Sequence, residues 1–481
     1  LHRPATRRNG DVVIGRDSAL EHLAFSDSIY TPDVVLSPDG PKKGWSVAVV
    51  QGAFAAIGPT ANVLRARPDL PEVALPGMAL IPGFVDSHQH LTQVFAKALI
   101  GAQPAQIWRR MWLPLYAAMS PEDAYTAAKW TCIEALRGGF TTIVTAGERD
   151  PSKVAPIEQA IADVGIRCGM AHDFSDLTSY ARPDAGSTSN SDTSHCVRAA
   201  TNYLAATPSN PRMIRSVACA SPQSASTELI AALAKLAAET STVFQIHANE
   251  HTPEVQWSLE SYGLRPIELL HEIRALGPQT LLAHATLVTP REIGIIEETG
   301  AAVSYNPVAS SWKGNAVAPA LEFANRGIPF GLGTDATRSD GFRLMDAAET
   351  AQRLTSGIRV DDWEAGRGAL WVDAATQGGA RAAGLDGVTG EIREGLRADF
   401  LLLDTTAPEV LPSWDFAWEL VRYYDRTHLK AVFVDGEPVI IDGRPTGWDL
   451  DRFIRECEPV ARKIVTESSM KLIGMDPRQR R

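Results

Sequence analysis

The sequence predicts an α/β fold: a (β/α)8 barrel of the TIM type, joined to a small β-sandwich-like domain built from both chain ends. Short apolar runs alternate with helical patterns through the middle of the chain, and proline opens several of those helical patterns. Strand-like runs at the start of the chain return near its end. Because parallel strands need crossover connections, alternating strands and helices favour a parallel barrel.

Each element follows from this alternation. The expected barrel strands occupy residues 81–86, 141–145, 166–172, 214–219, 243–247, 280–284, 301–305 and 329–334. The expected helices between them occupy residues 121–137, 156–164, 227–239, 266–276, 290–299 and 319–326. We therefore expect a composite β domain from residues 1–80 and 390–445, a barrel over residues 81–389, and a C-terminal helix and tail over residues 446–481.

One segment of the expected barrel differs in composition from the rest. Residues 178–194 are rich in Ser, Thr, Asp and Gly, and they follow the third expected strand. Such a segment is either an ordinary loop at the barrel edge or a lid over the substrate.

Composition excludes several classes of protein. The chain has 481 residues, 44% of them hydrophobic, and a formal net charge of −11, which argues against nucleic-acid binding. No long uncharged apolar run predicts a membrane span, and the N-terminal residues lack the apolar core of an export signal, so we expect a cytoplasmic protein. The five scattered cysteines form no CxxC motif, which excludes a thiolate zinc site.

Histidines end several of the expected strands. His88 and His90 end the first strand in the run PGFVDSHQH, and residues two apart on a strand face the same side. His247, His284 and Asp335 each end a later strand. The active sites of such barrels lie at the C-terminal ends of the strands, so we expect these side chains to meet around a metal ion.

Together these motifs resemble the amidohydrolase superfamily. The resemblance rests on PGFVDSHQH, on the strand-end His247 and His284, on GLGTDA with Asp335, and on GEIREGLRAD and VFVDG near the chain end. It covers roughly residues 40–445. The HxxE spacing from His247 to Glu250 resembles the triazine-hydrolase and aminohydrolase (deaminase) branch.

The resemblance implies a centre with one metal ion. Two-metal relatives carry a bridging carboxylated lysine at the end of strand four, and here residues 217–222 read VACASP, without lysine. His88, His90, His247 and Asp335 are then the expected ligands, with Asp335 either binding the metal closely or acting mainly as base to its water. Zinc is the default ion, and iron, cobalt or manganese also suit these donors.

The resemblance also implies catalytic roles. A divalent ion lowers the pKa of its bound water towards about 7, and Asp335 takes the proton. His284 is either a direct ligand or a hydrogen-bonding partner of the attacking water. Glu250 protonates the departing side of the C–N bond, although an acidic residue in this position can also be an ordinary helix-start carboxylate.

The sequence gives fewer indications of the residues that contact the substrate than of the metal ligands. Trp108 and Trp112 lie four residues apart and either stack on a planar ring or hold a helix to the barrel. Nucleobase deaminases of the family carry Pro-x-Ser-Asn where residues 307–311 read PVASS, which argues against a standard purine or cytosine. The residues expected to contact the substrate are Gln93, Trp108, Trp112, His172, His251, Asn306 and Arg338.

Three hypotheses about function follow. The first is a deaminase of a planar nitrogen heterocycle such as a triazine, pterin or purine-like ring. The second is a hydrolase of an acyclic C–N bond, as in relatives that degrade phenylureas or thiocarbamates, and the third is a non-enzymatic interaction protein, which the complete set of candidate ligands disfavours. We expect a small-molecule substrate and a homo-oligomer, with no nucleic-acid or membrane partner.

Overall fold

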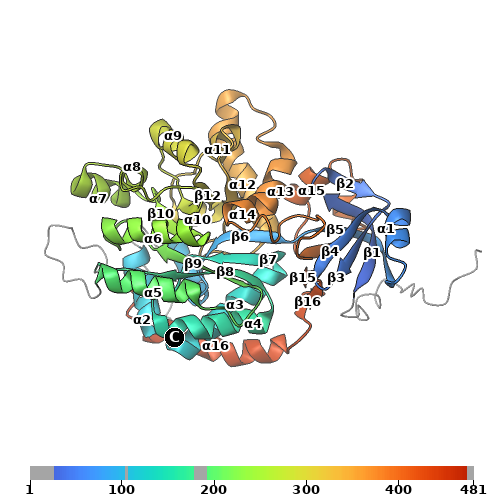
Figure 1. Ribbon diagram of the computed structural model, residues 1–481, viewed down its shortest axis with the longest axis horizontal. Coiled ribbons are helices and arrows are strands. Elements are labelled where there is room, and N and C mark those ends of the chain that lie inside the picture. The colour runs from blue at the N-terminus through green and yellow to red at the C-terminus, as the bar shows by residue number, and fades with distance from the viewer. Residues whose placement is uncertain (1–26, 103–106, 178–191, 474–481) are drawn as a thin grey trace, which may run out of the picture.

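Two β-sheets organise the protein. A computed structural model describes residues 27–102, 107–177 and 192–473, and Figure 1 shows the barrel beside a second sheet formed by the chain ends. Residues 178–191, most of the segment with the lid hypothesis, and residues 1–26 of the expected composite domain lie outside the described residues.

The barrel is a sheet of eight strands that follow one another in chain order. All neighbouring strands pair in parallel, and a bridge from Gln89 to Asp335 brings the last strand back to the first. The strands are β6 (Phe84–Gln89), β7 (Phe140–Thr145), β8 (Arg167–Asp173), β9 (Met213–Cys219), β10 (Phe244–Ala248), β11 (Thr280–His284), β12 (Ala302–Tyr305) and β13 (Phe330–Leu332). The predicted barrel is therefore confirmed.

Helices surround this sheet (Figure 1), and the six predicted helices are among them. They are α2 (Leu113–Ala118), α3 (Pro121–Arg137), α4 (Pro151–Val164), α5 (Thr193–Ala205), α6 (Thr227–Thr240), α7 (Thr252–Tyr262), α8 (Pro266–Glu272), α9 (Pro290–Thr299), α10 (Pro307–Lys313), α11 (Ala320–Asn325), α12 (Gly341–Gln352), α13 (Arg367–Ala375) and α14 (Gln377–Ala382). Helix α4 begins five residues before the predicted Pro156, because the Asp150 side chain caps it by accepting from Ser152 N.

Short helical turns lie among these longer elements. They are η1 (Val94–Ala102), η2 (Trp108–Trp112), η3 (Arg353–Gly357), η4 (Ile358–Val360) and η5 (Pro408–Val410). Two of them, η1 and η2, follow the first barrel strand, and Trp108 of η2 lines a cavity beside the C-terminal ends of the strands.

The second sheet joins the two ends of the chain. It has nine strands in the order β17-β16-β15-β14-β5-β1-β3-β4, with β2 paired to β1. Rings of Phe54 and Phe400 lie 6.2 Å apart although three strands separate them in the sheet, so the sheet curls around its own apolar core. Its elements are β1 (Ser28–Ser37), β2 (Gly40–Lys43), β3 (Trp45–Val50), β4 (Ala53–Pro59), α1 (Thr60–Ala66), β5 (Glu72–Pro82), β14 (Phe400–Asp404), β15 (Leu429–Val434), β16 (Glu437–Ile441) and β17 (Arg444–Pro445).

A buried ionic cluster fastens this sheet to the N-terminal ends of the barrel strands. Arg167, the first residue of β8, contacts Asp399 at 2.7 Å and Asp435 at 2.5 Å. Arg212, just before β9, contacts Asp435 at 2.9 Å. The second sheet therefore covers the end of the barrel opposite the strand-end histidines.

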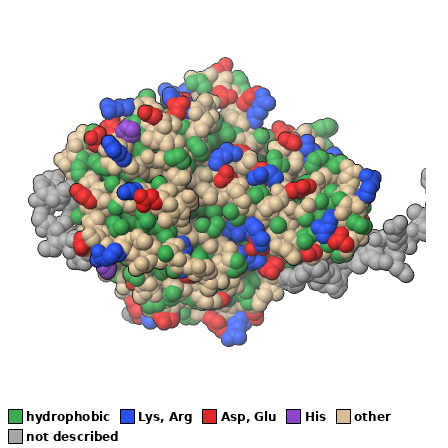
Figure 2. Space-filling view, viewed as in Figure 1, with side chains coloured by type: hydrophobic (Ala, Val, Ile, Leu, Met, Phe, Trp, Pro, Cys, Tyr) green, Lys and Arg blue, Asp and Glu red, His purple; other side chains and the backbone are tan. Residues whose placement is uncertain are grey.

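The C-terminal helix packs against helices on the outside of the barrel. Helix α16 (Leu450–Glu467) contacts α2 and α3, and its Ile464 packs in a cluster with Met111, Trp112 and Leu115. Helix α15 (Phe416–Arg422) precedes it and packs against α13. Among the described residues, no helix is both long and apolar enough to cross a membrane. On the face drawn in Figure 2, acidic and basic side chains are interspersed.

Candidate active site and metal centre

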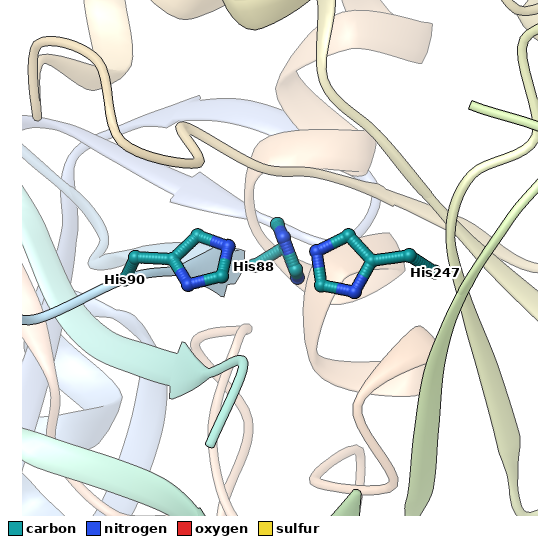
Figure 3. Close-up of side chains that lie close together, drawn as sticks. All are labelled: His88, His90 and His247. Atoms are coloured by element: carbon teal, nitrogen blue, oxygen red, sulfur yellow. The ribbon is translucent and has the colours of Figure 1, made fainter. Parts of the chain in front are cut away.

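Three histidine rings meet at the C-terminal end of the barrel. His88 and His90 lie at the end of β6 and His247 at the end of β10, and Figure 3 shows the His88 ring between the other two. The centroid of the His88 ring lies 5.1 Å from that of the His90 ring and 4.8 Å from that of the His247 ring. One ring nitrogen from each histidine lies within 4.8 Å of the others, which is close enough for all three to bind one ion.

The chemistry of these rings suits a metal. His88 Nε2 is buried and has no hydrogen-bond partner in the described structure, a costly arrangement unless something else contacts it. Burial lowers the pKa of His88 well below its ordinary value and that of His90 to about 4. The rings are therefore neutral and keep the lone pairs that a divalent ion needs.

Asp335 completes the donor set just after β13. Its Oδ1 lies 3.5 Å from His90 Nε2, and its Oδ2 lies 3.8 Å from His284 Nε2. His88, His284 and Asp335 form a second group of possible metal ligands. Asp335 has φ of 56° and His284 has φ of 78°, a left-handed conformation that non-glycine residues rarely adopt. Such strain at two strand ends is typical of a functional site.

A hydrogen-bonded chain behind His284 fixes its orientation. Asn306 Oδ1 accepts from Ser304 Oγ at 2.9 Å, so its amide nitrogen is the group that faces His284 Nδ1 at 3.2 Å. Nδ1 is then an acceptor, and the ring proton lies on Nε2, which points into the centre. A Cβ at Gly333 would lie 2.2 Å from Asn306 Oδ1, so only glycine permits this approach.

Glu250 faces the same centre from the end of β10. Its Oε1 lies 3.0 Å from Lys313 Nζ, 3.0 Å from His251 Nε2 and 3.5 Å from Asn315 Nδ2. Burial alone would raise the pKa of Glu250, but electrostatic interactions with His284, Lys313 and His251 outweigh burial and hold that pKa well below its ordinary value.

His251 is held by the same contacts. Its Nδ1 lies 3.1 Å from Asn315 Oδ1. Burial would lower its pKa, but the neighbouring Glu250 carboxylate outweighs burial and raises that pKa. His251, which the sequence predicts to lie near the substrate, thus contacts Glu250 directly.

Lys313, like Asn315, is a residue of this centre that the sequence motifs did not indicate. It ends α10, where Gly314 adopts the left-handed conformation with φ of 69°. Its ammonium lies 2.5 Å from Asp335 Oδ2 and 3.0 Å from Glu250 Oε1, and its side chain is 10% exposed. A lysine just before a glycine in the segment after strand seven was the available signal, because that segment must cross the C-terminal end of the barrel.

A cavity of about 250 Å³ opens beside the histidines. Trp108 and Tyr116 form an aromatic wall with ring centroids 5.8 Å apart, and Arg149 pairs with Asp173 at 2.8 Å on another wall. The lining residues are His90, Trp108, Leu113, Tyr116, Ala117, Ala146, Gly147, Glu148, Arg149, Asp150, Lys153, Asp173, Ala220 and His247. The cavity therefore offers both a ring face and charged groups.

The residues expected at the substrate divide into two sets. Trp108 lines the cavity, and Gln93 donates to the Tyr116 hydroxyl at 2.5 Å while its own Oε1 is buried without a hydrogen-bond partner in the described structure. Asn306 instead contacts His284. Trp112 is 3% exposed and packs in the core beside α16.

The other two expected contacts, His172 and Arg338, are not among the residues that line the cavity. His172 stacks on Phe174 with ring centroids 4.3 Å apart and meets Tyr203 of α5, so its neighbour Asp173 faces the cavity in its place. Side chains alternate along a strand, and the two residues therefore lie on opposite faces. Arg338 is exposed.

Comparisons with known proteins agree with this geometry. A sequence profile described as the amidohydrolase family matches residues 79–444. A 5-methylthioadenosine/S-adenosylhomocysteine deaminase from Nitratidesulfovibrio vulgaris is 27% identical over 422 residues, which cover 87% of this chain and 93% of that one. A 5'-deoxyadenosine deaminase from Methanothermobacter thermautotrophicus is 28% identical over 373 residues, 76% of this chain and 83% of that one.

Solved structures share the fold. An adenosine deaminase from Xanthomonas campestris with bound zinc has a TM-score of 0.81 at 22% identity, covering 92% of this chain and 99% of that one. A variant atrazine chlorohydrolase from Arthrobacter aurescens, complexed with zinc and atraton, has a TM-score of 0.80 at 20% identity, covering 90% and 99%. The matched profile spans every strand of the barrel and all the strand-end ligands. The chain therefore belongs to the amidohydrolase family.

Proposed function

We propose that this amidohydrolase is a metal-dependent deaminase of a planar nitrogen heterocycle. The observation that carries the proposal is the convergence of three neutral imidazoles and Asp335 with two further polar groups, Glu250 and His284, beside a cavity with an aromatic wall. The curated relatives described above support it, since both are named as deaminases of adenine nucleosides.

One divalent ion per chain, which we propose to be zinc, fits the donor set of His88, His90, His247 and Asp335. Iron, cobalt or manganese would suit the same donors. When bound, such an ion lowers the pKa of a coordinated water and so supplies a nucleophile at neutral pH.

The side chains around the ion then divide the work. Asp335 takes the proton of the attacking water through Oδ2, the oxygen that faces His284. His284 donates through Nε2 to the oxygen that is being added, because Asn306 holds its other nitrogen as an acceptor. Glu250, 3.6 Å from His284 Nε2, handles the proton that the departing nitrogen needs.

The cavity indicates the shape of the substrate. Trp108 offers a face on which a flat ring can stack, and Tyr116 stands edge-on to it. A volume of about 250 Å³ is at the small end for ligand pockets, which suits a one- or two-ring heterocycle with small substituents. We propose Trp108 as the ring contact, with Gln93 acting through the Tyr116 hydroxyl.

The experiment is a substrate panel with the metal-loaded protein. Triazines, pterins, adenine nucleosides and phenylureas are scored for released ammonia against released amine and carbon dioxide. Ammonia from a heterocycle supports the proposal. Amine with carbon dioxide supports the second hypothesis, an acyclic C–N bond of the phenylurea or thiocarbamate type and a role in xenobiotic degradation, and it would contradict the first.

Glu250→Gln sharpens this test. The variant should keep its metal and lose most turnover, because Gln cannot carry the proton. Glu239→Gln, on the exposed side of α6, is the matched control and should leave turnover unchanged. Full activity of Glu250→Gln would refute the proton role.

The expected homo-oligomer remains a prediction with one supporting feature. Trp363 and Trp414 are 80% and 88% exposed, and Leu354, Ile358 and Val360 are exposed near Trp363 in the chain. Exposed apolar side chains in such number are typical of an interaction surface. The mass of the chain in solution tests the prediction.

A further inference from the structure

Lys313 places a positive charge beside the two carboxylates to which the proposed function gives proton transfer. Its ammonium contacts Asp335 Oδ2 at 2.5 Å and Glu250 Oε1 at 3.0 Å. These oxygens belong to the two carboxylates that face the reaction centre, and His284 Nε2 lies within 3.8 Å of both of them. The ammonium thus lies beside the groups that handle water and the departing nitrogen.

Addition of water to a heteroaromatic carbon has a specific electrostatic requirement. The attack moves electron density from the attacked carbon to the ring nitrogen next to it, and a donor aimed at that nitrogen lowers the barrier. A donor that is already charged and already fixed in place is more effective than a neutral one.

Glu250 is poorly placed to be that donor through the oxygen that faces the centre. Donors from Lys313, His251 and Asn315 lie within 3.5 Å of its Oε1. An oxygen that accepts several hydrogen bonds has no free position from which to donate one. Of these three donors to Glu250 Oε1, Lys313 is the one that also contacts Asp335.

We propose that Lys313 is a catalytic residue of this site, whose ammonium donates a hydrogen bond to the ring nitrogen next to the attacked carbon. The inference rests on the proposed deaminase function and adds the substrate class: heterocycles with an unprotonated nitrogen next to the carbon that bears the amino group. Glu250 and Asp335 hold the ammonium in place from two sides. No proton has to leave Lys313: the proton that water gives to Asp335 is passed by way of Glu250 to the departing amino group, the C–N bond breaks, and ammonia leaves while the hydroxyl group stays on the ring carbon.

A purely structural role for Lys313 makes a different prediction. Its charge would then only balance the two carboxylates, and a bound metal would take over that balance. Removing the ammonium would leave the metal-loaded enzyme with its activity and its preference among rings unchanged. The two roles therefore differ in ligand discrimination as well as in rate.

The first test compares Lys313→Met with Lys235→Met, an exposed lysine of α6 with a side chain that is 76% exposed. With the best substrate of the panel, Lys313→Met should lose about 10²–10³-fold in kcat while keeping its metal content, and Lys235→Met should match the wild type. A kcat of Lys313→Met within threefold of the wild type overturns the proposal.

The second test measures binding rather than turnover. The desamino form of that substrate, which cannot release ammonia, is compared by calorimetry with its analogue that has CH in place of the ring nitrogen. The wild type should prefer the nitrogen ring by about tenfold or more, as for a hydrogen bond to a charged group. Lys313→Met should bind both rings equally.

The second test keeps the inference testable if Lys313→Met fails to fold, because a wild type that binds both rings equally overturns it without any variant. A metal-loaded wild type that deaminates no heterocycle contradicts the proposed function itself. Deamination by the wild type together with an unchanged Lys313→Met contradicts only the role of Lys313.

Discussion

Buried charged groups gather at both ends of the barrel, and the two clusters are built differently. At the N-terminal end, Arg167 is 2% exposed and binds Asp399 and Asp435, and Asp399 accepts further hydrogen bonds from Thr389 Oγ1 and from the Asp435 backbone. Each charge of this cluster has an opposite partner. Buried groups paired in this way hold a structure together but have no capacity left for a ligand.

In the C-terminal cluster, by contrast, some buried polar atoms have no partner within the described structure. The buried Nε2 atoms of His88 and His284 have no hydrogen-bond partner in the described structure. His284 and Asp335 also have strained backbones. Unpaired buried atoms and local backbone strain, rather than buried charge itself, therefore distinguish a candidate reaction centre from a structural ionic cluster.

The largest effect on the C-terminal cluster is expected from His88→Ala, which removes one candidate metal ligand. The wild type should bind about one transition-metal ion per chain, and the variant should lose both the metal and activity to background while its circular dichroism stays unchanged. Metal analysis and turnover measure this. His271→Ala, an exposed position on α8, is the control and should keep both. Two ions per wild-type chain would contradict the centre with one metal ion.

Asp399→Ala tests the other cluster. It leaves the Arg167 guanidinium short of one partner in a site where Asp399 is 2% exposed. Loss of one partner of a buried pair lowers the free energy of unfolding by about 3–5 kcal/mol, as denaturant unfolding would show. Glu239→Ala, in an exposed pair with Lys235, should cost less than about 1 kcal/mol. Equal effects of the two changes would refute the structural role.

The smallest expected effect is a dependence of stability on pH. Burial would raise the pKa of Asp435, but hydrogen bonds and charges from Arg397, Arg167 and Arg212 outweigh it and lower that pKa from 3.8 to about 2. A carboxyl group with a lowered pKa contributes stability that is complete above its ordinary pKa and is lost as the pH falls through the folded value.

The melting temperature of the wild type should therefore fall between pH 4 and pH 2, beyond the general acid effect. Asp435→Asn should have a lower melting temperature at pH 7 and a weaker dependence over this window. A variant whose melting temperature follows the wild type across the whole range would show that Asp435 contributes nothing.

Local sequence patterns predicted most of the barrel. The strand predicted at residues 280–284 and the helices predicted at residues 121–137 and 290–299 have the observed bounds. The first predicted strand, residues 81–86, crosses a junction instead: β5 ends at Pro82 in the second sheet and β6 begins at Phe84. Apolar residues flank Pro82 and Gly83 on both sides, so periodicity alone does not reveal the change of sheet, and only the Pro-Gly pair marks it.

The fold and the candidate ligands at the strand ends follow from the sequence alone, because a strand has a fixed alternation of side chains and a barrel gathers its strand ends at one edge. Only the tertiary structure decided what the segments beyond those ends contribute. Lys313 reaches Glu250, 63 residues earlier in the chain, because α10 stops at Gly314, and Asn306 turns to His284 because Gly333 leaves room. Such contacts depend on the paths of several loops at once, which no local pattern encodes.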